Sequence, residues 1–236
     1  AAADEMKAYL LDGEQRALAL DNRGPLIFDD HGDLDPAIRE AYSRYGFYIF
    51  EGVIDAAELQ DIRTDLDAMR ARFPTGPESP VDAQGEPALG VDHSALTLVW
   101  SKPLGDPLGG TALANGRHEI KMFEPAAASD TPAAAPFLLL GSLQFSDACL
   151  RVYGHPLLLQ VAEQINGPDF APFNEALFIK DPGIGAAVSW HQDGVTHWDS
   201  DHFEENIHGF NFMAQVYGST AVNGVWVLPG THKQGK

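Results

Sequence analysis

A histidine and an aspartate lie two residues apart in the segment 190–193, which reads Trp-His-Gln-Asp. In a strand, residues two apart point to the same face, so His191 and Asp193 would present an imidazole and a carboxylate side by side. Two histidines and one carboxylate on one face suit a divalent transition metal and leave coordination positions open, as in non-haem iron enzymes. The pair therefore predicts a metal site. Such tripeptides also arise by chance, and the alternative is a solvated pair at a strand end.

Two further motifs flank this pair. Residues 180–183 read Lys-Asp-Pro-Gly, and residues 223–233 read NGVWVLPGTHK. In this order, the motifs resemble those of the phytanoyl-CoA dioxygenase family of Fe(II)/2-oxoglutarate oxygenases. The segment 46–69, an aromatic strand followed by a helix, is similar to the opening of that family's domain.

The resemblance implies roles for individual residues. His191 and Asp193 would be two of three ligands of Fe(II), Lys121 would help to hold 2-oxoglutarate, and Asn174 would line the site. Trp198, with His197 beside it, would contact the substrate. The family's third histidine ligand follows the 223–233 motif, as does an arginine that pairs with the far carboxylate of 2-oxoglutarate. We therefore expect both beyond Lys236, in a continuation of the chain.

Some assignments have alternatives. By spacing alone His232 could be the third ligand, whereas the resemblance assigns it to a turn after a strand. Lys121 could be a solvated lysine at a strand edge, and Lys180 is expected to be structural. Related halogenases carry a small residue in place of the carboxylate, so Asp193 favours hydroxylation.

The composition excludes several classes of function. The 236 residues include 34 acidic and 15 basic side chains, a net charge of −19, which disfavours nucleic acid and anionic membranes as partners. The single cysteine, Cys149, precludes an intrachain disulfide, and we expect it in the core. No apolar run reaches the roughly 18 residues that a membrane span needs, and no signal-peptide pattern opens the chain. These features predict a soluble cytoplasmic protein and leave its oligomeric state open. A small-molecule substrate is what the resemblance implies.

A cluster of carboxylates follows the metal pair. It would disfavour an anionic CoA thioester and tolerate a neutral or cationic substrate, although a solvated acidic loop is the alternative. Its members are Asp199, Asp201, Glu204 and Glu205.

The elements that must position these residues change along the chain. Periodicity and capping residues predict helices at the N-terminus and over 36–45, 55–73, 137–153 and 156–165. Aromatic and β-branched runs predict strands over 46–50, 176–179, 209–217 and 225–228. The segments 74–116 and 125–136 are expected to be loops. The first of these and residues 194–207 are candidates for a shield over the site.

Helices that precede short strands predict an α+β protein with a mainly β core, flanked by N-terminal helices. Together with the resemblance, this gives a double-stranded β-helix, a cupin-like jelly roll, in one domain over residues 1–236. The expected function is a dioxygenase that hydroxylates a small organic substrate and releases succinate and CO2. Two alternatives stay open: a jelly-roll metal enzyme that does not use 2-oxoglutarate, such as a cupin dioxygenase or a zinc hydrolase, and a catalytically silent binding module.

Overall fold

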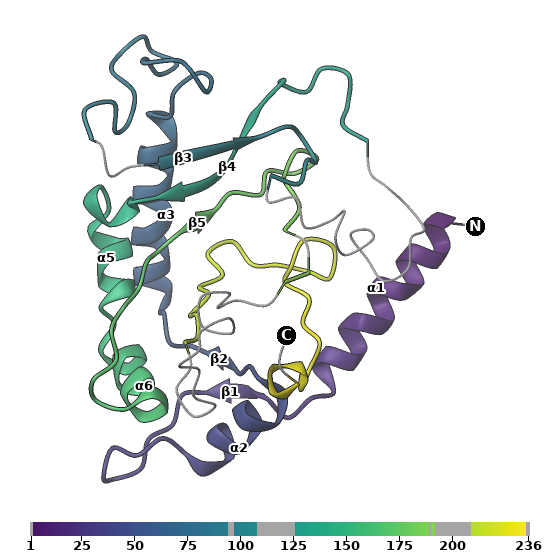
Figure 1. The fold of residues 1–236 in the computed structure, drawn as a ribbon, viewed down its shortest axis with the longest axis vertical. Coiled ribbons are helices and arrows are strands. Elements are labelled where there is room, and N and C mark those ends of the chain that lie inside the picture. Colours follow the sequence, from purple (N-terminus) through teal and green to yellow (C-terminus); the bar gives the residue numbers. More distant parts are fainter. Residues whose placement is uncertain (1, 94–96, 108–125, 189, 192–208, 235–236) are drawn as a thin grey trace. The chain divides into compact units, whose positions relative to one another are not determined.

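The computed structural model describes residues 2–93, 97–107, 126–188, 190–191 and 209–234 (Figure 1). Its helices are α1 (Ala2–Leu18), α2 (Pro36–Tyr45), α3 (Ala56–Ala71), α5 (Asp147–Tyr153) and α6 (Pro156–Asn166), with short 3-10 helices η1 (Ser142–Gln144) and η2 (Thr231–Lys233). Its strands are β1 (Arg23–Pro25), β2 (Ile49–Glu51), β3 (Thr97–Ser101), β4 (Ala135–Leu140) and β5 (Leu177–Phe178). The protein is therefore α+β, as predicted. The sheets among the described residues have two and three strands, and these residues do not show the predicted double-stranded β-helix. None of the helices described is both long and apolar enough to cross a membrane.

The described residues divide into two compact units. The first is built mainly from Ala57–Tyr153 and Phe173–His191, and the second from Asp4–Ala56, Gly154–Pro172 and the described residues after 208. Each unit has its own hydrophobic cluster. The prediction of a single domain is not tested by this division.

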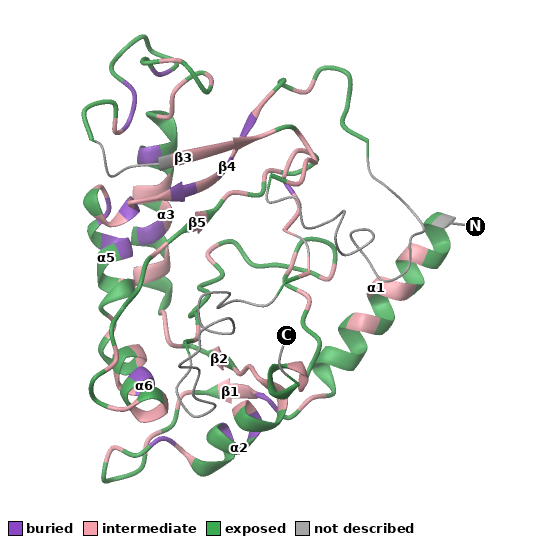
Figure 2. Ribbon diagram, in the orientation of Figure 1, coloured by how far each residue is buried: buried purple, intermediate pink, exposed green. Residues whose placement is uncertain are grey.

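The first unit contains a three-stranded antiparallel sheet in the order β3-β4-β5. Along β4, buried and half-buried residues alternate, as expected for a strand with one face against a core. Phe137 and Leu139 are the most deeply buried side chains of this strand (Figure 2). Leu139 packs with Met69 of α3 and with Leu89, so the helix covers this part of the sheet.

The second unit contains a short parallel pair, β1 and β2, connected through α2 (Figure 1). This pair is parallel, whereas the sheet of the first unit is antiparallel. A parallel pair needs a crossover connection, and α2 supplies it. Ile38 of this helix packs with Leu34 and with Val161 of α6 in the core of the unit.

Capping residues set the ends of α2 as the sequence predicts. The Asp35 carboxylate accepts a hydrogen bond from the backbone N–H of Ala37 at 2.7 Å, and Pro36 occupies the first turn. The helix ends at Gly46, where φ is +85° and the backbone N–H donates to Tyr42 at 2.8 Å. Gly46 is thus a helix cap, and the strand predicted over 46–50 is β2, beginning three residues later. The helices predicted over 55–73 and 156–165 are confirmed as α3 and α6.

The helix predicted over 137–153 is wrong in its first part. Residues 135–140 form β4, Gly141 follows with φ of +88°, and helix α5 begins only at Asp147. A short leucine-rich run fits a buried strand as well as a helix, and periodicity alone does not separate them. Pairing with β3 and β5 settles this segment as a strand.

The strands predicted over 209–217 and 225–228 are not found: both segments are irregular in the structure. Their sequence has strand propensity, but a strand forms only where a neighbouring strand accepts its hydrogen bonds. Part of the later segment is instead organised by turns and by Trp226, whose indole stacks on Tyr9 at 5.1 Å and donates to the carbonyl of Ala221.

The long loop predicted over 74–116 is only partly correct, because β3 lies within it. Residues 74–93 are also well organised: Asp82, which is 5% exposed, accepts backbone hydrogen bonds from Gln84 and Glu86. Ala88 and Leu89 are buried in the first unit. These two residues thus anchor the segment, although most of its other residues are exposed. Its role as a shield stays a prediction. Residues 108–116 lie outside the described residues. The loop predicted over 125–136 gives way to β4 at Ala135.

Candidate metal centre

Strand β5 positions the segment that leads to the predicted metal pair. It pairs with β4, with Leu177 opposite Leu139 and Phe178 opposite Leu138. Just before it, the Glu175 carboxylate accepts hydrogen bonds from the backbone N–H of Gly141 at 2.7 Å and from the hydroxyl of Ser142 at 2.8 Å. The segment therefore leaves the sheet from a fixed starting point.

His191 follows this segment in the first unit, and its side chain is exposed. This exposure fits both the predicted metal ligand and the alternative of a solvated side chain. Asn174 is also exposed and lies directly before Glu175. The structure thus places the two residues at opposite ends of the chain segment that contains β5.

The other predicted site residues fall outside the described residues. These are Asp193, Lys121, His197 and Trp198. Their roles stay predictions.

His232, the alternative third ligand, lies in η2 of the second unit. Its Nε2 is 3.1 Å from the backbone oxygen of Ser43, near the end of α2. Its ring also lies directly against Gly46, with Nδ1 as the nearest atom to the position a Cβ would take. Both ring nitrogens thus face the last turn of α2, and the neighbouring Gly230 N–H donates to Tyr45 at 2.9 Å. This packing supports the assignment of His232 to a turn.

A metal ion at this site would need His, Cys, Asp or Glu side chains as ligands. Among the described residues there is no group of three or more His, Cys, Asp or Glu side chains that could hold a metal ion. The described part contains His191 but not Asp193, so it holds at most half of the predicted pair. An exposed imidazole with a carboxylate two residues later is a donor set that fits Fe(II).

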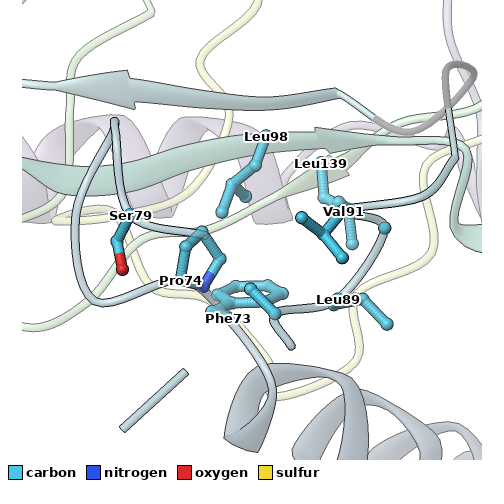
Figure 3. A pocket seen from close by; sticks show the side chains of 9 residues that line it. Phe73, Pro74, Ser79, Leu89, Val91, Leu98 and Leu139 are labelled. Carbon is cyan, nitrogen blue, oxygen red and sulfur yellow. The ribbon is translucent and has the colours of Figure 1, made fainter. Parts of the chain in front are cut away.

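The described part of the first unit contains two small cavities. The first, of about 140 Å³, is lined by apolar side chains that include Phe73, Leu98 and Leu139, with the Ser79 hydroxyl at its edge (Figure 3). It is smaller than the roughly 300–1,000 Å³ typical of ligand pockets. The second, of about 180 Å³, shares residues 88, 90 and 91 with it and is lined also by Arg72, Asp92 and His93. The lining of neither cavity includes a predicted site residue.

The charged groups that fix this unit were not found from the sequence. Asp65 of α3 accepts hydrogen bonds from the Ser146 hydroxyl and the Ala148 N–H, and Glu175 ties β5 to the end of β4. Arg70 of α3 pairs with Asp181. The sequence offered one signal for these groups: Asp65 and Arg70 lie next to the apolar positions Leu66 and Met69 of the helix predicted over 55–73.

Comparison with protein-family models shows which family the chain belongs to. The model of the phytanoyl-CoA dioxygenase (PhyH) family matches residues 42–236, which include the 190–193 and 223–233 motifs. The chain therefore belongs to the phytanoyl-CoA dioxygenase family, as its motifs predicted. No curated protein matches it in a sequence comparison.

Membership defines the general chemistry. The family consists of oxygenases that depend on Fe(II) and 2-oxoglutarate and have a cupin-like fold. Small molecules are the substrates that this chemistry implies.

Proposed function

We propose that the protein is an Fe(II)- and 2-oxoglutarate-dependent dioxygenase that hydroxylates a small organic substrate. The observation that carries the proposal is the family match, which extends across both sequence motifs. The balanced reaction converts a substrate C–H, O2 and 2-oxoglutarate into an alcohol, succinate and CO2. Bound Fe(II) supplies the oxidising chemistry, and the protein binds and orients the reactants.

In this proposal each predicted residue has one task. His191 and Asp193 hold the metal together with a third ligand. Lys121 neutralises the far carboxylate of 2-oxoglutarate. Asn174 lines the site. The intact Asp193 carboxylate occupies the position that a halogenase leaves open, so the product is an alcohol.

The substrate is expected to contact Trp198 and His197. The carboxylates at 199, 201, 204 and 205 follow them directly, and the chain has a net charge of −19. This charge raises the free energy of an approaching polyanion, so we propose a neutral or cationic substrate rather than a CoA thioester. The cupin-like family fold is the basis for proposing a jelly roll around the site, and a cytoplasmic location remains a prediction from the sequence.

Succinate release tests the proposal. The full-length protein is loaded with Fe(II) without oxygen, mixed with 2-oxoglutarate and air, and succinate is measured by NMR. We expect succinate from the wild-type protein and a fall of at least about a hundredfold in Asp193→Ala, because one of the metal ligands is lost. An Asp193→Ala protein that releases succinate at the wild-type rate would falsify the proposal. Hydrolysis that needs Zn(II) and no 2-oxoglutarate would identify a zinc hydrolase instead.

A further inference from the structure

The chain between β5 and His191 forms a loop that is closed on itself. The Lys180 ammonium donates a hydrogen bond to the backbone oxygen of Ala186 at 2.7 Å, and Ala186 is 4% exposed. Within the loop, the N–H groups of Ile184 and Gly185 donate to the backbone oxygen of Asp181 at 3.1 and 2.9 Å. The lysine side chain therefore spans the two ends of the loop.

The same loop is attached to two other segments of the first unit. The Asp181 carboxylate pairs with the Arg70 guanidinium of α3 at 2.5 Å, and the Asp181 side chain is 23% exposed. On the other side, the Ala187 N–H donates to Gly105 at 2.8 Å, and the Ile184 oxygen accepts from Leu104 at 2.7 Å. Helix α3 and the segment after β3 thus hold the loop from two directions.

This attachment limits where His191 can lie. Ala187 is held by this hydrogen bond to Gly105, and His191 follows four positions later. Four extended residues reach at most about 14 Å. The segment therefore approaches the predicted metal from a fixed base rather than from a free loop.

We infer that Arg70, Lys180 and Asp181 are positioning residues that hold this loop so that His191 reaches the metal in one orientation. This inference rests on the proposed function, in which His191 is a metal ligand. A charged pair of this exposure contributes little to global stability, so its effect is local. Residues that do not touch the metal but fix the orientation of a metal ligand affect metal affinity strongly, because a misplaced ligand binds the metal less well.

A second ion pair on the same helix gives a matched control. Asp61 of α3 pairs with Arg151 of α5 at 2.8 Å. The two arginines are equally exposed, at 50% for Arg151 and 52% for Arg70, whereas the Asp61 side chain is 65% exposed and that of Asp181 is 23% exposed. Asp61→Asn therefore removes a more exposed ion pair from α3, one whose partner lies in α5 and not in the 180–187 loop. The test variants are Arg70→Gln and Lys180→Met, with Arg70→Lys as the conservative rescue.

The first measurement uses the metal-free protein. Hydrogen–deuterium exchange is followed in peptides that cover residues 180–191. We expect the amides of Ile184, Gly185 and Ala187 to exchange at least several-fold faster in Arg70→Gln and Lys180→Met, and at the wild-type rate in Asp61→Asn. Equal exchange in all three variants and the wild type would overturn the inference.

The second measurement is the Kd for Fe(II) in the full-length protein without oxygen. We expect a roughly tenfold weaker Kd in Arg70→Gln and Lys180→Met, recovery in Arg70→Lys, and no change in Asp61→Asn. If the wild type binds Fe(II) and all variants bind it equally well, the inference fails and the proposed function stands. If the wild type binds no Fe(II), both fail.

Discussion

Cys149 shows how burial decides the chemistry of a side chain in this protein. It lies in α5 and is 8% exposed, and burial raises the pKa of its thiol, with Ser146 acting in the opposite, weaker direction. A thiol with a raised pKa stays protonated at neutral pH, and the protonated form is a poor nucleophile. The sequence-based interpretation of Cys149 as a core residue is confirmed.

This leads to a prediction about thiol reactivity. In the folded protein at pH 8, Cys149 should react with iodoacetamide at a rate at least about tenfold below that of the unfolded chain, because both its pKa and its burial limit the thiolate. The rate should rise with pH, and the rise should come at higher pH than in the unfolded chain, because burial raises the pKa of the Cys149 thiol. Mass spectrometry of timed samples measures it. Equal rates with and without denaturant would contradict the burial described.

The end of α2 joins a backbone requirement to a packing requirement. Gly46 has a φ of +85°, which disfavours any residue with a side chain, and the His232 ring lies where a Cβ would project. Gly52 also has a positive φ, of +73°, but nothing lies within 4 Å of its Cβ position. The two glycines therefore separate the cost of conformation from the cost of a clash.

We predict that Gly46→Ala lowers the free energy of unfolding by more than Gly52→Ala. Gly52→Ala should cost about 1 kcal/mol for conformation alone, and Gly46→Ala should cost about 1–3 kcal/mol more because the ring must move. Urea denaturation measures both. In a His232→Ala background the two costs should become similar, and a persisting difference would refute the contact between His232 and the helix end.

The sequence was most informative where local chemistry decides the structure. The Asp35 cap and the apolar spacing in α3 determine helices from neighbouring residues, so these elements were predictable. Gly46 was assigned to the following strand, whereas it caps α2. Strands depend on partners far along the chain. The leucine-rich β4 was therefore mistaken for a helix, and residues 209–217 were mistaken for a strand.

In the candidate site, too, features set by neighbouring residues were predictable and those set by distant residues were not. The pair of His191 and Asp193 is a weak signal alone, but together with the later motif it indicated the family, which is confirmed. The metal-binding roles of the two residues stay predictions. The supports of the site were not predictable, because Arg70 and Asp181 are 111 positions apart and only the folded chain brings them together. Predictions for Lys121, Asp193, His197 and Trp198 rest on the resemblance, since these residues lie outside the described part of the chain.

At the scale of the whole molecule, two properties bear on function: the family to which the chain belongs and its net charge. The chain belongs to a family that uses Fe(II) and 2-oxoglutarate, and its net charge of −19 is the basis for proposing a neutral or cationic substrate. Both cosubstrates must meet at one metal. The central claim is therefore that one imidazole and one carboxylate, from His191 and Asp193, bind the same ion.

Anomalous diffraction at the iron absorption edge tests that claim most directly. Crystals of the full-length protein, grown with Fe(II) and 2-oxoglutarate in the absence of oxygen, are measured above and below the edge. The account predicts a single strong anomalous peak about 2.0–2.2 Å from a nitrogen of His191 and an oxygen of Asp193, the usual range for such ligands. A map in which these two side chains point apart, with no shared metal peak between them, would contradict it.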